Sequence, residues 1–262
     1  MQKLIYDVGV CDGTDTEYYL RCGYEVIGIE ANPRMVKLLK AKFSAELAQG
    51  RFKLLNIGVA EQDGELDFWV SDLPEWSSFD RSIASRNGTG HHLVQVTTSR
   101  FEKIVAAHGV PYYCKIDIEG NDWLCLAGMT AETAPKYLSI EMSHAQGDRD
   151  LAMLSALGYS DFKIVSQVTR AQPIQLITAL GYRLPPRASR LSRKLVKRLL
   201  GVWRSDGWQF PSNSSGGFGE NTPGSWKSSD HTLRTWQLLH DIDLKYATHG
   251  LGEWFDIHAR MK

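Results

Sequence analysis

Carboxylate side chains stand where three apolar segments of this sequence end. Asp7 closes the first segment, Glu30 closes the second, and the pair Asp117 and Glu119 closes the third. A carboxylate accepts hydrogen bonds from hydroxyl groups and attracts cations. Two carboxylates held close together can also raise the pKa of one of them and make it a base. We therefore expect a site for a ligand that carries positive charge and hydroxyl groups.

A short glycine turn lies between Gly9 and Gly13, directly after the first segment. A strand, a glycine turn into a helix and a second strand ending in a carboxylate are typical of sites for adenosine-containing cofactors. The spacing G-x-x-x-G differs from the G-x-G-x-x-G of dinucleotide sites, and Asp7 and Asp12 would repel a pyrophosphate. The same carboxylates would attract the sulfonium and ammonium groups of S-adenosylmethionine (SAM). The turn thus favours SAM over NAD, although an ordinary strand-to-helix turn would carry the same glycines.

The expected cofactor contacts follow from this arrangement. Glu30 would accept hydrogen bonds from the ribose hydroxyls, and Asp7 would lie on the side of the methionine ammonium. Asn32 is interpreted first as the cap of the next helix, with the ribose edge as its alternative. The polar loop that contains Ser78 either folds inward to the cofactor or stays solvated. The predicted cofactor-binding residues are Asp7, Gly9, Cys11, Asp12, Gly13, Glu30, Asn32, Ser78 and, flanking adenine, Ile57 and Val59.

If a methyl group from SAM is transferred to an alcohol, a base must lie within hydrogen-bond reach of that acceptor. The predicted catalytic residues are Asp117, Glu119 and His144. Asp117 and Glu119 lie two apart, so they point to the same side if the strand continues regularly. With Asp122 or Glu141 they could instead bind a divalent metal, which the residue types allow but which is not part of the prediction. The structural alternative is that Glu119 caps the following helix and Asp117 hydrogen-bonds the turn.

Strands and helices alternate along most of the chain. The expected strands are residues 3–8, 25–30, 52–59, a returning hairpin strand at 65–70, a short one at 92–97, 112 onward into the turn at 120, 137–142, 162–166 and 254–258. The expected helices are residues 14–22, 33–47, one ending at 108, 148–157 and 228–246, with a hairpin turn at 62–64 and a loop at 71–91. Repeated strand–helix units predict a mainly parallel sheet with helices on both faces and a ligand at the carboxyl ends of its strands.

The composition excludes several classes of protein. The 262 residues contain 30 basic and 30 acidic side chains, so the net charge is zero and no nucleic-acid partner is expected. The four cysteines form no C-x-x-C pair, which favours a reducing compartment. No signal peptide or long apolar segment is recognised. We expect a cytoplasmic protein, with the inner face of a membrane as its alternative location.

We expect three parts in the chain. Residues 1–167 would form the cofactor-binding core, residues 168–252 an inserted substrate cap, and residues 253–262 the final core strand. The cap contains a basic stretch at 183–204 with leucines at helical spacing. Such a helix either packs through its leucines or lies on an anionic membrane surface or phosphate-bearing substrate. Its basic residues are Arg183, Arg187, Arg190, Arg193, Lys194, Lys197, Arg198 and Arg204.

Several stretches of the chain resemble the FkbM-type methyltransferases, a branch of the class I SAM-dependent enzymes. The likeness lies in DVGVCDG at 7–13 with VIGIEANP at 26–33, NIGVA at 56–60, KIDIEG at 115–120 and LSIEM at 138–142. The last part of the chain resembles the tail of one subset of the family, at SGGFGE (215–220), PGSW (223–226) and WFDIHA (254–259). KIDIEG is the most specific of these motifs, and the likeness covers most of the chain.

This resemblance implies a Rossmann-like α/β fold of the class I methyltransferases, with a mainly parallel seven-stranded sheet, an antiparallel last strand and an inserted helical cap. It also implies methyl transfer to a hydroxyl of a sugar, glycan or glycosylated metabolite. The chain departs from the family at Val10-Cys11, where Ala-Asn is common, and at Ala31, where Pro is common. A nitrogen or other small-molecule acceptor, or a SAM-binding module without catalysis, are the alternatives. The sequence does not indicate the oligomeric state.

Overall fold

The computed structural model divides the chain into two compact units, Met1–Leu138 and Ser139–Lys262. The residues described are 3–142, 146–167, 170–173, 188, 191, 194–195, 198–199, 204–205, 207–211, 214–246 (backbone only at 242–246) and 254–262. Each unit is described separately below. The expected domain boundaries at residues 167 and 252 remain predictions.

The core of the first unit is a set of parallel strands in the order β3 (Phe52–Leu55), β2 (Glu25–Ile29), β1 (Leu4–Val8) and β7 (Tyr113–Ile116). Every residue of β1 and β7 is buried, which explains why both segments are mainly apolar, with Asp7 and Lys115 as their only charged residues. The helices of the unit are α1 (Thr14–Arg21), α2 (Pro33–Lys42), α3 (Ser44–Ala48), α4 (Arg81–Ala84), α5 (Phe101–His108) and α6 (Asp122–Ala127). The predicted strand–helix alternation is confirmed.

The predicted helix over residues 33–47 is wrong in one respect, because it consists of two helices. Phe43 lies between α2 and α3 with φ −107° and ψ 28°, outside the helical region. Its ring is buried and packs edge-on against Phe52 of β3 at 5.2 Å. The burial of this ring accompanies the interruption between α2 and α3.

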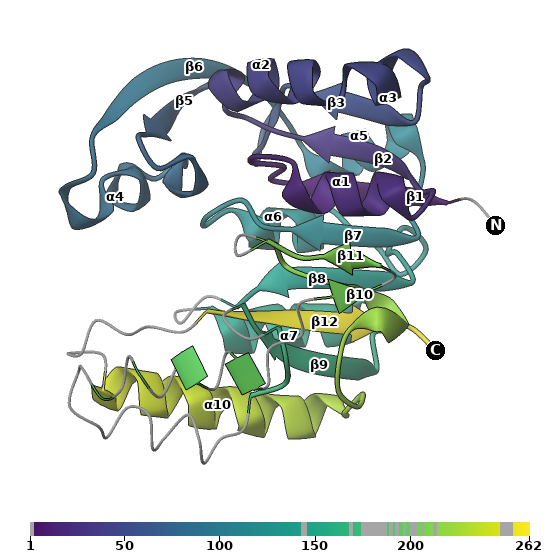
Figure 1. Ribbon diagram of the computed structural model, residues 1–262, viewed down its shortest axis with the longest axis vertical. Helices are drawn as coiled ribbons and strands as arrows, with labels where there is room; N and C mark the ends of the chain where they lie inside the picture. The colour runs from purple at the N-terminus through teal and green to yellow at the C-terminus, as the bar shows by residue number, and fades with distance from the viewer. Residues whose placement is uncertain are drawn as a thin grey trace. The chain divides into compact units, whose positions relative to one another are not determined.

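The turn at residues 62–64 does not form the expected hairpin. The strand after it, β5 (Gly64–Ser71), pairs with β6 (His91–Ser99) in antiparallel orientation, and β6 also pairs with β4 (Gly58–Val59). The predicted loop at 71–91 contains 3-10 turns at Pro74–Trp76 and Arg86–Gly88 and the helix α4. Figure 1 shows β5 and β6 leaving the main strands of this unit, with α4 near their far end. We call residues 64–99 the arm.

The second unit contains β9 (Asp161–Ser166) and the last strand β12 (Phe255–Arg260), paired in antiparallel orientation with Ile257 opposite Ile164. Strand β8 (Tyr137–Glu141) lies at the division of the chain. The order of hydrogen-bonded strands is β3-β2-β1-β7-β8-β12-β9. The expected seven-stranded, mainly parallel sheet with an antiparallel last strand is confirmed.

Two long helices belong to the second unit, α7 (Gly147–Ala156) and α10 (Ser229–Tyr246). The α10 helix contacts α7 and β9. Trp236 of α10 is 1% exposed, and a Cβ added at Gly147 would lie 2.5 Å from its indole nitrogen. Part of the expected cap, residues 229–241, therefore packs as a core helix of this unit. The remaining described strands here are β10 (Arg204–Ser205) and β11 (Trp208–Gln209).

The leucines of the basic stretch do not pack where they are described. Leu191, Leu195 and Leu199 are 70%, 56% and 71% exposed, so the packing alternative is wrong for these three side chains. Among the helices that the structure describes, none combines the length and the apolar character needed to cross a membrane.

Candidate functional site

The glycine turn after β1 depends on a very close approach of two backbone segments. Gly9 has φ 84°, and its N–H donates to the Ile29 carbonyl of β2 at 2.9 Å. A Cβ at this position would lie 1.8 Å from the carbonyl oxygen of Asp117. Only glycine combines the left-handed conformation with this contact. Gly9 therefore brings the end of β1 against the segment that follows β7.

Glu30 lies directly after β2, and the backbone of the turn holds its carboxylate. The N–H of Cys11 donates to Glu30 Oε2 at 2.9 Å, and the N–H of Asn32 donates to Oε1 at 2.8 Å. Cys11 has φ 51°, which directs its N–H toward the carboxylate. Burial raises the pKa of Glu30 to about 7, and the two backbone hydrogen bonds oppose that shift. Each oxygen retains a second lone pair for a ligand donor.

Asp7 lies deeper than predicted. It is fully buried, Thr16 Oγ1 donates to its Oδ2 at 2.6 Å, and Lys115 Nζ lies 3.6 Å from its Oδ1. The same ammonium lies 3.5 Å from Asp15 and 3.6 Å from Asp117. Burial raises the pKa of Asp7 to about 6, while Lys115 opposes the shift. Asp7 thus joins β1, α1 and β7, and its predicted contact with an ammonium group remains a prediction.

The remaining predicted cofactor residues are three turn or cap residues and two apolar residues. Asp12 is exposed, and its Oδ1 accepts the N–H of Thr14 at 3.0 Å, so it stabilises the first turn of α1. Gly13 has φ 76°, and a Cβ there would clash with Phe43 and Leu39. Asn32 caps α2 as first interpreted, since its Oδ1 accepts the N–H of Arg34 at 3.0 Å. Val59 is buried in β4, and Ile57 before it is half-buried.

Ser78 lies inward rather than in a solvated loop. It is 2% exposed, and its Oγ donates to the carbonyl of Glu119 at 2.8 Å. The neighbouring Ser77 Oγ accepts from Asn32 Nδ2 at 3.3 Å. The arm therefore reaches both the end of β2 and the turn after β7.

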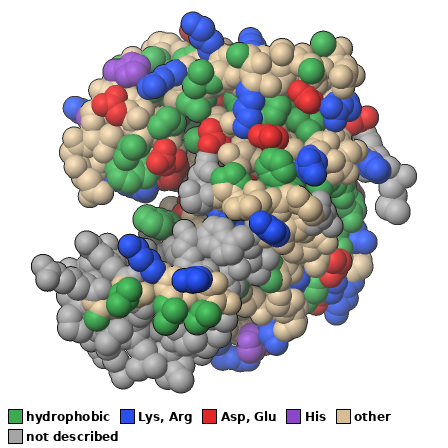
Figure 2. Space-filling model, in the orientation of Figure 1, with side chains coloured by type: hydrophobic (Ala, Val, Ile, Leu, Met, Phe, Trp, Pro, Cys, Tyr) green, Lys and Arg blue, Asp and Glu red, His purple; other side chains and the backbone are tan. Residues whose placement is uncertain are grey.

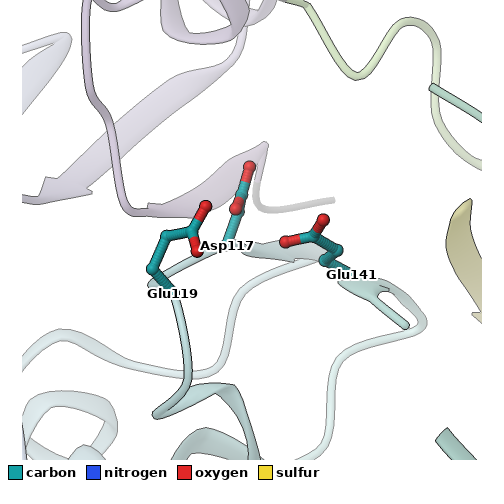
Figure 3. Close-up of side chains that lie close together, drawn as sticks. All are labelled: Asp117, Glu119 and Glu141. Carbon is teal, nitrogen blue, oxygen red and sulfur yellow. The ribbon is translucent and has the colours of Figure 1, made fainter. Parts of the chain in front are cut away.

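Asp117 and Glu119 follow the last residue of β7, and carboxylate oxygens of the two lie within 4.8 Å of one another. In Figure 3 their side chains rise from the same stretch of chain. Glu119 does not cap the next helix, because α6 has no side-chain hydrogen bond at its N-cap and the Glu119 carboxylate pairs with Arg86. The structural alternative for Glu119 is therefore wrong.

The charge of Glu119 is balanced by one cation of the arm. Arg86 Nη1 lies 3.0 Å from Glu119 Oε2, and the acid side chain is 18% exposed. Burial raises the pKa of Glu119 to about 7, Asp117 adds to the shift, and Arg86 opposes it. A carboxyl group with a pKa near neutrality suits proton transfer at physiological pH.

Two other acid or base candidates of the sequence are His144 and Glu141. His144 lies outside the described residues, so its predicted role remains a prediction. Glu141, the third side chain of Figure 3, belongs to the second unit. The structure adds Lys115, Asp15, Thr16 and Arg86 to the site. The two-residue spacing of Lys115 and Asp117 places both on one side of β7, which was a usable signal for the lysine, whereas no local pattern indicated Arg86.

Comparison with known proteins gives the chain a family. The profile of the methyltransferase FkbM domain matches residues 7–184. No curated protein matches. A crystal structure of the methyltransferase FkbM from Methylobacillus flagellatus KT is similar at 18% identity and a TM-score of 0.44, covering 63% of this chain and 40% of that one. A structure described as StiE O-MT residues 942-1257 covers 99% of this chain and 68% of that one, at 7% identity and a TM-score of 0.43. This chain spans less than half the length of the first of these. Because the profile match extends over more than half of its residues, the chain belongs to the FkbM methyltransferase family.

Proposed function

We propose that the protein is a SAM-dependent O-methyltransferase that methylates a hydroxyl of a sugar, a glycan or a glycosylated metabolite. The observation that carries this proposal is the Glu30 carboxylate, held by two backbone N–H groups next to the glycine turn. Membership of a methyltransferase family supports the reaction class.

The residues of the first unit fit such a cofactor. Glu30 would offer acceptor lone pairs to the two ribose hydroxyls, and Val59 of β4 and the half-buried Ile57 before it are the apolar residues that would flank an adenine ring. The nearby carboxylates outnumber the single buried cation, Lys115, which favours a ligand with positive charge. When bound, SAM supplies an electrophilic methyl group on a sulfonium.

The carboxylate pair supplies the proton acceptor in this proposal. An alcohol must lose its proton as the new bond to carbon forms, and a base in hydrogen-bond reach accelerates such steps by roughly 10²–10⁴-fold. Glu119 takes this role, because its raised pKa and partial exposure suit a general base. Asp117 lies close to the Glu119 carboxylate, and the ammonium of Lys115 is 3.6 Å from its Oδ2.

The test of the proposal begins with cofactor binding. Calorimetry with SAM and with S-adenosylhomocysteine should give binding to the wild type. Glu30→Gln should weaken binding roughly 10- to 100-fold, the effect of losing a charge-assisted hydrogen bond. Glu220→Gln in the second unit is the matched control and should bind normally. Absence of binding to either ligand by the wild type would refute the proposal.

Labelled SAM then separates an enzyme from a module that only binds. The protein is incubated with methyl-labelled SAM and fractions of small molecules and polysaccharides. Label in a carbohydrate fraction, sensitive to Glu119→Gln, is expected. Label in an amine fraction would select the nitrogen acceptor instead, and binding without transfer to any fraction would select the regulatory alternative.

A further inference from the structure

The arm holds the turn that carries Glu119 at two points. Ser78 Oγ donates to the main-chain carbonyl of Glu119 at 2.8 Å, and Arg86 Nη1 lies 3.0 Å from its carboxylate. Ser78 also accepts the N–H of Asp80 at 3.0 Å, which fixes the direction of its hydroxyl. A Cβ added at Gly120 would lie 2.9 Å from Ile83 of α4, so the arm also packs closely on this turn.

The backbone at this turn has a conformation that needs support. Glu119 has φ 49° and Gly120 has φ 105°. A non-glycine residue in the left-handed region persists only when its surroundings hold it there. The hydrogen bond from Ser78 provides such support for the main chain, and Arg86 selects the direction of the side chain.

We propose that Arg86 and Ser78 are positioning residues that fix the Glu119 carboxylate in the orientation needed to accept the proton of the acceptor hydroxyl. This inference rests on the proposed function, because it takes Glu119 as the base. It gives the arm, which is separate from the main strands, a part in the reaction. Neither residue needs to touch the cofactor.

Geometry decides the expected size of the effect. Arg86 is 39% exposed at its side chain, so the ion pair contributes little to the stability of the fold. A misplacement of a reacting group by about 1 Å can nevertheless slow a reaction roughly 100-fold. Loss of the arginine should therefore reduce kcat strongly while the protein remains folded.

The experiment compares Arg86→Gln, Arg86→Lys and Ser78→Ala with the control Arg81→Gln. Arg81 lies on the same arm, but its guanidinium packs over Trp69 at 4.9 Å, away from Glu119. With the carbohydrate fraction that accepts label, Arg86→Gln should lower kcat by roughly 10- to 100-fold at unchanged KM for SAM. Arg86→Lys should recover part of the loss, and Arg81→Gln should behave as wild type.

Two further readouts keep this inference separate from the proposed function. Binding of S-adenosylhomocysteine should be the same in all four variants, and amide hydrogen exchange at residues 117–121 should rise in Ser78→Ala. If the wild type transfers methyl groups and Arg86→Gln does so equally well, the positioning role is refuted while the enzyme assignment stands. A rise in the KM for the acceptor at unchanged kcat would also refute it, because Arg86 would then bind the acceptor directly.

The exposed leucines carry a second, independent inference about the other unit. The described helical residues of the basic stretch are Ala188, Leu191, Lys194, Leu195, Arg198 and Leu199, and all of them are exposed. Leucines at every fourth position lie on one face of a helix, with Lys194 and Arg198 beside them. In Figure 2, hydrophobic and basic side chains lie next to one another near the lower left of the molecule.

We infer that this face binds the surface of an anionic phospholipid bilayer. From residue 162 to residue 205 the sequence has no Asp or Glu, so charge complementarity selects an anionic partner. Exposed leucines beside lysine and arginine suit the boundary between lipid headgroups and acyl chains. The face would bring the enzyme to acceptors held at a membrane.

Vesicle co-sedimentation tests this binding. The wild type should bind vesicles that contain phosphatidylserine, bind pure phosphatidylcholine vesicles weakly, and be released by salt. A variant with Leu191→Ser, Leu195→Ser and Leu199→Ser should bind roughly tenfold more weakly. Leu38→Ser, at a leucine of α2 that is 54% exposed, is the control and should bind normally. Equal binding by the triple variant, or no binding by the wild type, would refute the inference.

Discussion

Charged side chains are buried in both units of the molecule, but their partners differ. In the second unit, Lys163 is 2% exposed, donates to the Thr222 carbonyl at 2.6 Å and lies 4.2 Å from the centre of the Trp226 ring. Arg260 covers the same ring at 4.6 Å and pairs with Asp161 at 2.7 Å. These contacts tie the segment around residue 226 to β9 and β12.

In the first unit, the buried acids are less completely balanced. The pKa of Glu30 and the pKa of Glu119 are both raised to about 7, chiefly by burial. The Glu30 carboxylate accepts hydrogen bonds from two backbone N–H groups, and the Glu119 carboxylate forms an ion pair with one half-exposed arginine. Burial of charge alone therefore does not identify a ligand site. Carboxylates that pay a desolvation cost and keep acceptor capacity are the better signal.

Gly9→Ala should have the largest effect, because it alters the glycine turn of the first unit. The new Cβ would lie 1.8 Å from the Asp117 carbonyl, so β1 and β7 would have to separate. We expect a loss of more than roughly 4 kcal/mol in the free energy of unfolding and no measurable SAM binding. Denaturant unfolding and calorimetry measure the two quantities.

Gly50→Ala is the control for this change. Gly50 has φ 71° but nothing within 4 Å of an added Cβ. Its cost should be only about 1–2 kcal/mol, from the left-handed conformation alone. If the two variants were equally stable, the close approach at Gly9 would not be a constraint on the fold.

Lys163→Met tests the second region and should have an intermediate effect. The methionine keeps the volume but leaves the Thr222 carbonyl without its donor, which should cost about 1–3 kcal/mol of unfolding free energy. SAM affinity should not change, because the contacts of Lys163 are structural. Lys37→Met, at an exposed position of α2, should change neither quantity. Weaker SAM binding by Lys163→Met at full stability would break the distinction between the two regions.

The smallest expected effect is a pH dependence of opposite sign in the two regions. Burial raises the pKa of Glu30 from 4.5 to about 7, so its contribution to stability is complete below pH 4.5 and is lost as the pH rises through 7. Burial lowers the pKa of His258 from 6.5 to about 3, so its contribution is complete above pH 6.5 and is lost as the pH falls toward 3.

Unfolding free energies measured between pH 5 and 6.5 check these signs. Relative to the wild type, Glu30→Gln should make stability rise more steeply with pH. His258→Leu should make it rise less steeply. If both variants changed the slope of stability against pH in the same direction, the pKa of Glu30 or that of His258 would not be shifted in the direction given above.

Much of the first unit was predictable from local patterns. Asn32 and Pro33 marked the start of α2, and the apolar segments marked β1, β2 and β7, because caps and buried strands act over a few residues. The break at Phe43 and the position of β6 between β4 and β5 were not predictable in this way. Both depend on contacts outside the local segment, with Phe52 of β3 in the first case and with a strand some thirty residues further on in the second.

The site divides in the same manner. Gly9, Glu30, Asp117 and Glu119 were predicted as site residues from residue type and strand ends. Arg86 was not found, because its only link to the site is spatial and spans 33 residues of chain. The depth of Asp7 was also not predictable, since a carboxylate at a strand end reads the same whether it faces a ligand or a buried lysine.

The sequence by itself determined that this chain folds as alternating strands and helices with acidic strand ends and a glycine turn, because those features depend on periodicity and on the conformations that single residues allow. Tertiary structure alone decided which acids are neutralised and which keep free acceptors. That outcome depends on burial and on cations supplied by distant segments, Lys115 for Asp7 and Arg86 for Glu119. Electrostatic energy follows distance and solvent exposure, and neither is written in the order of residues along the chain.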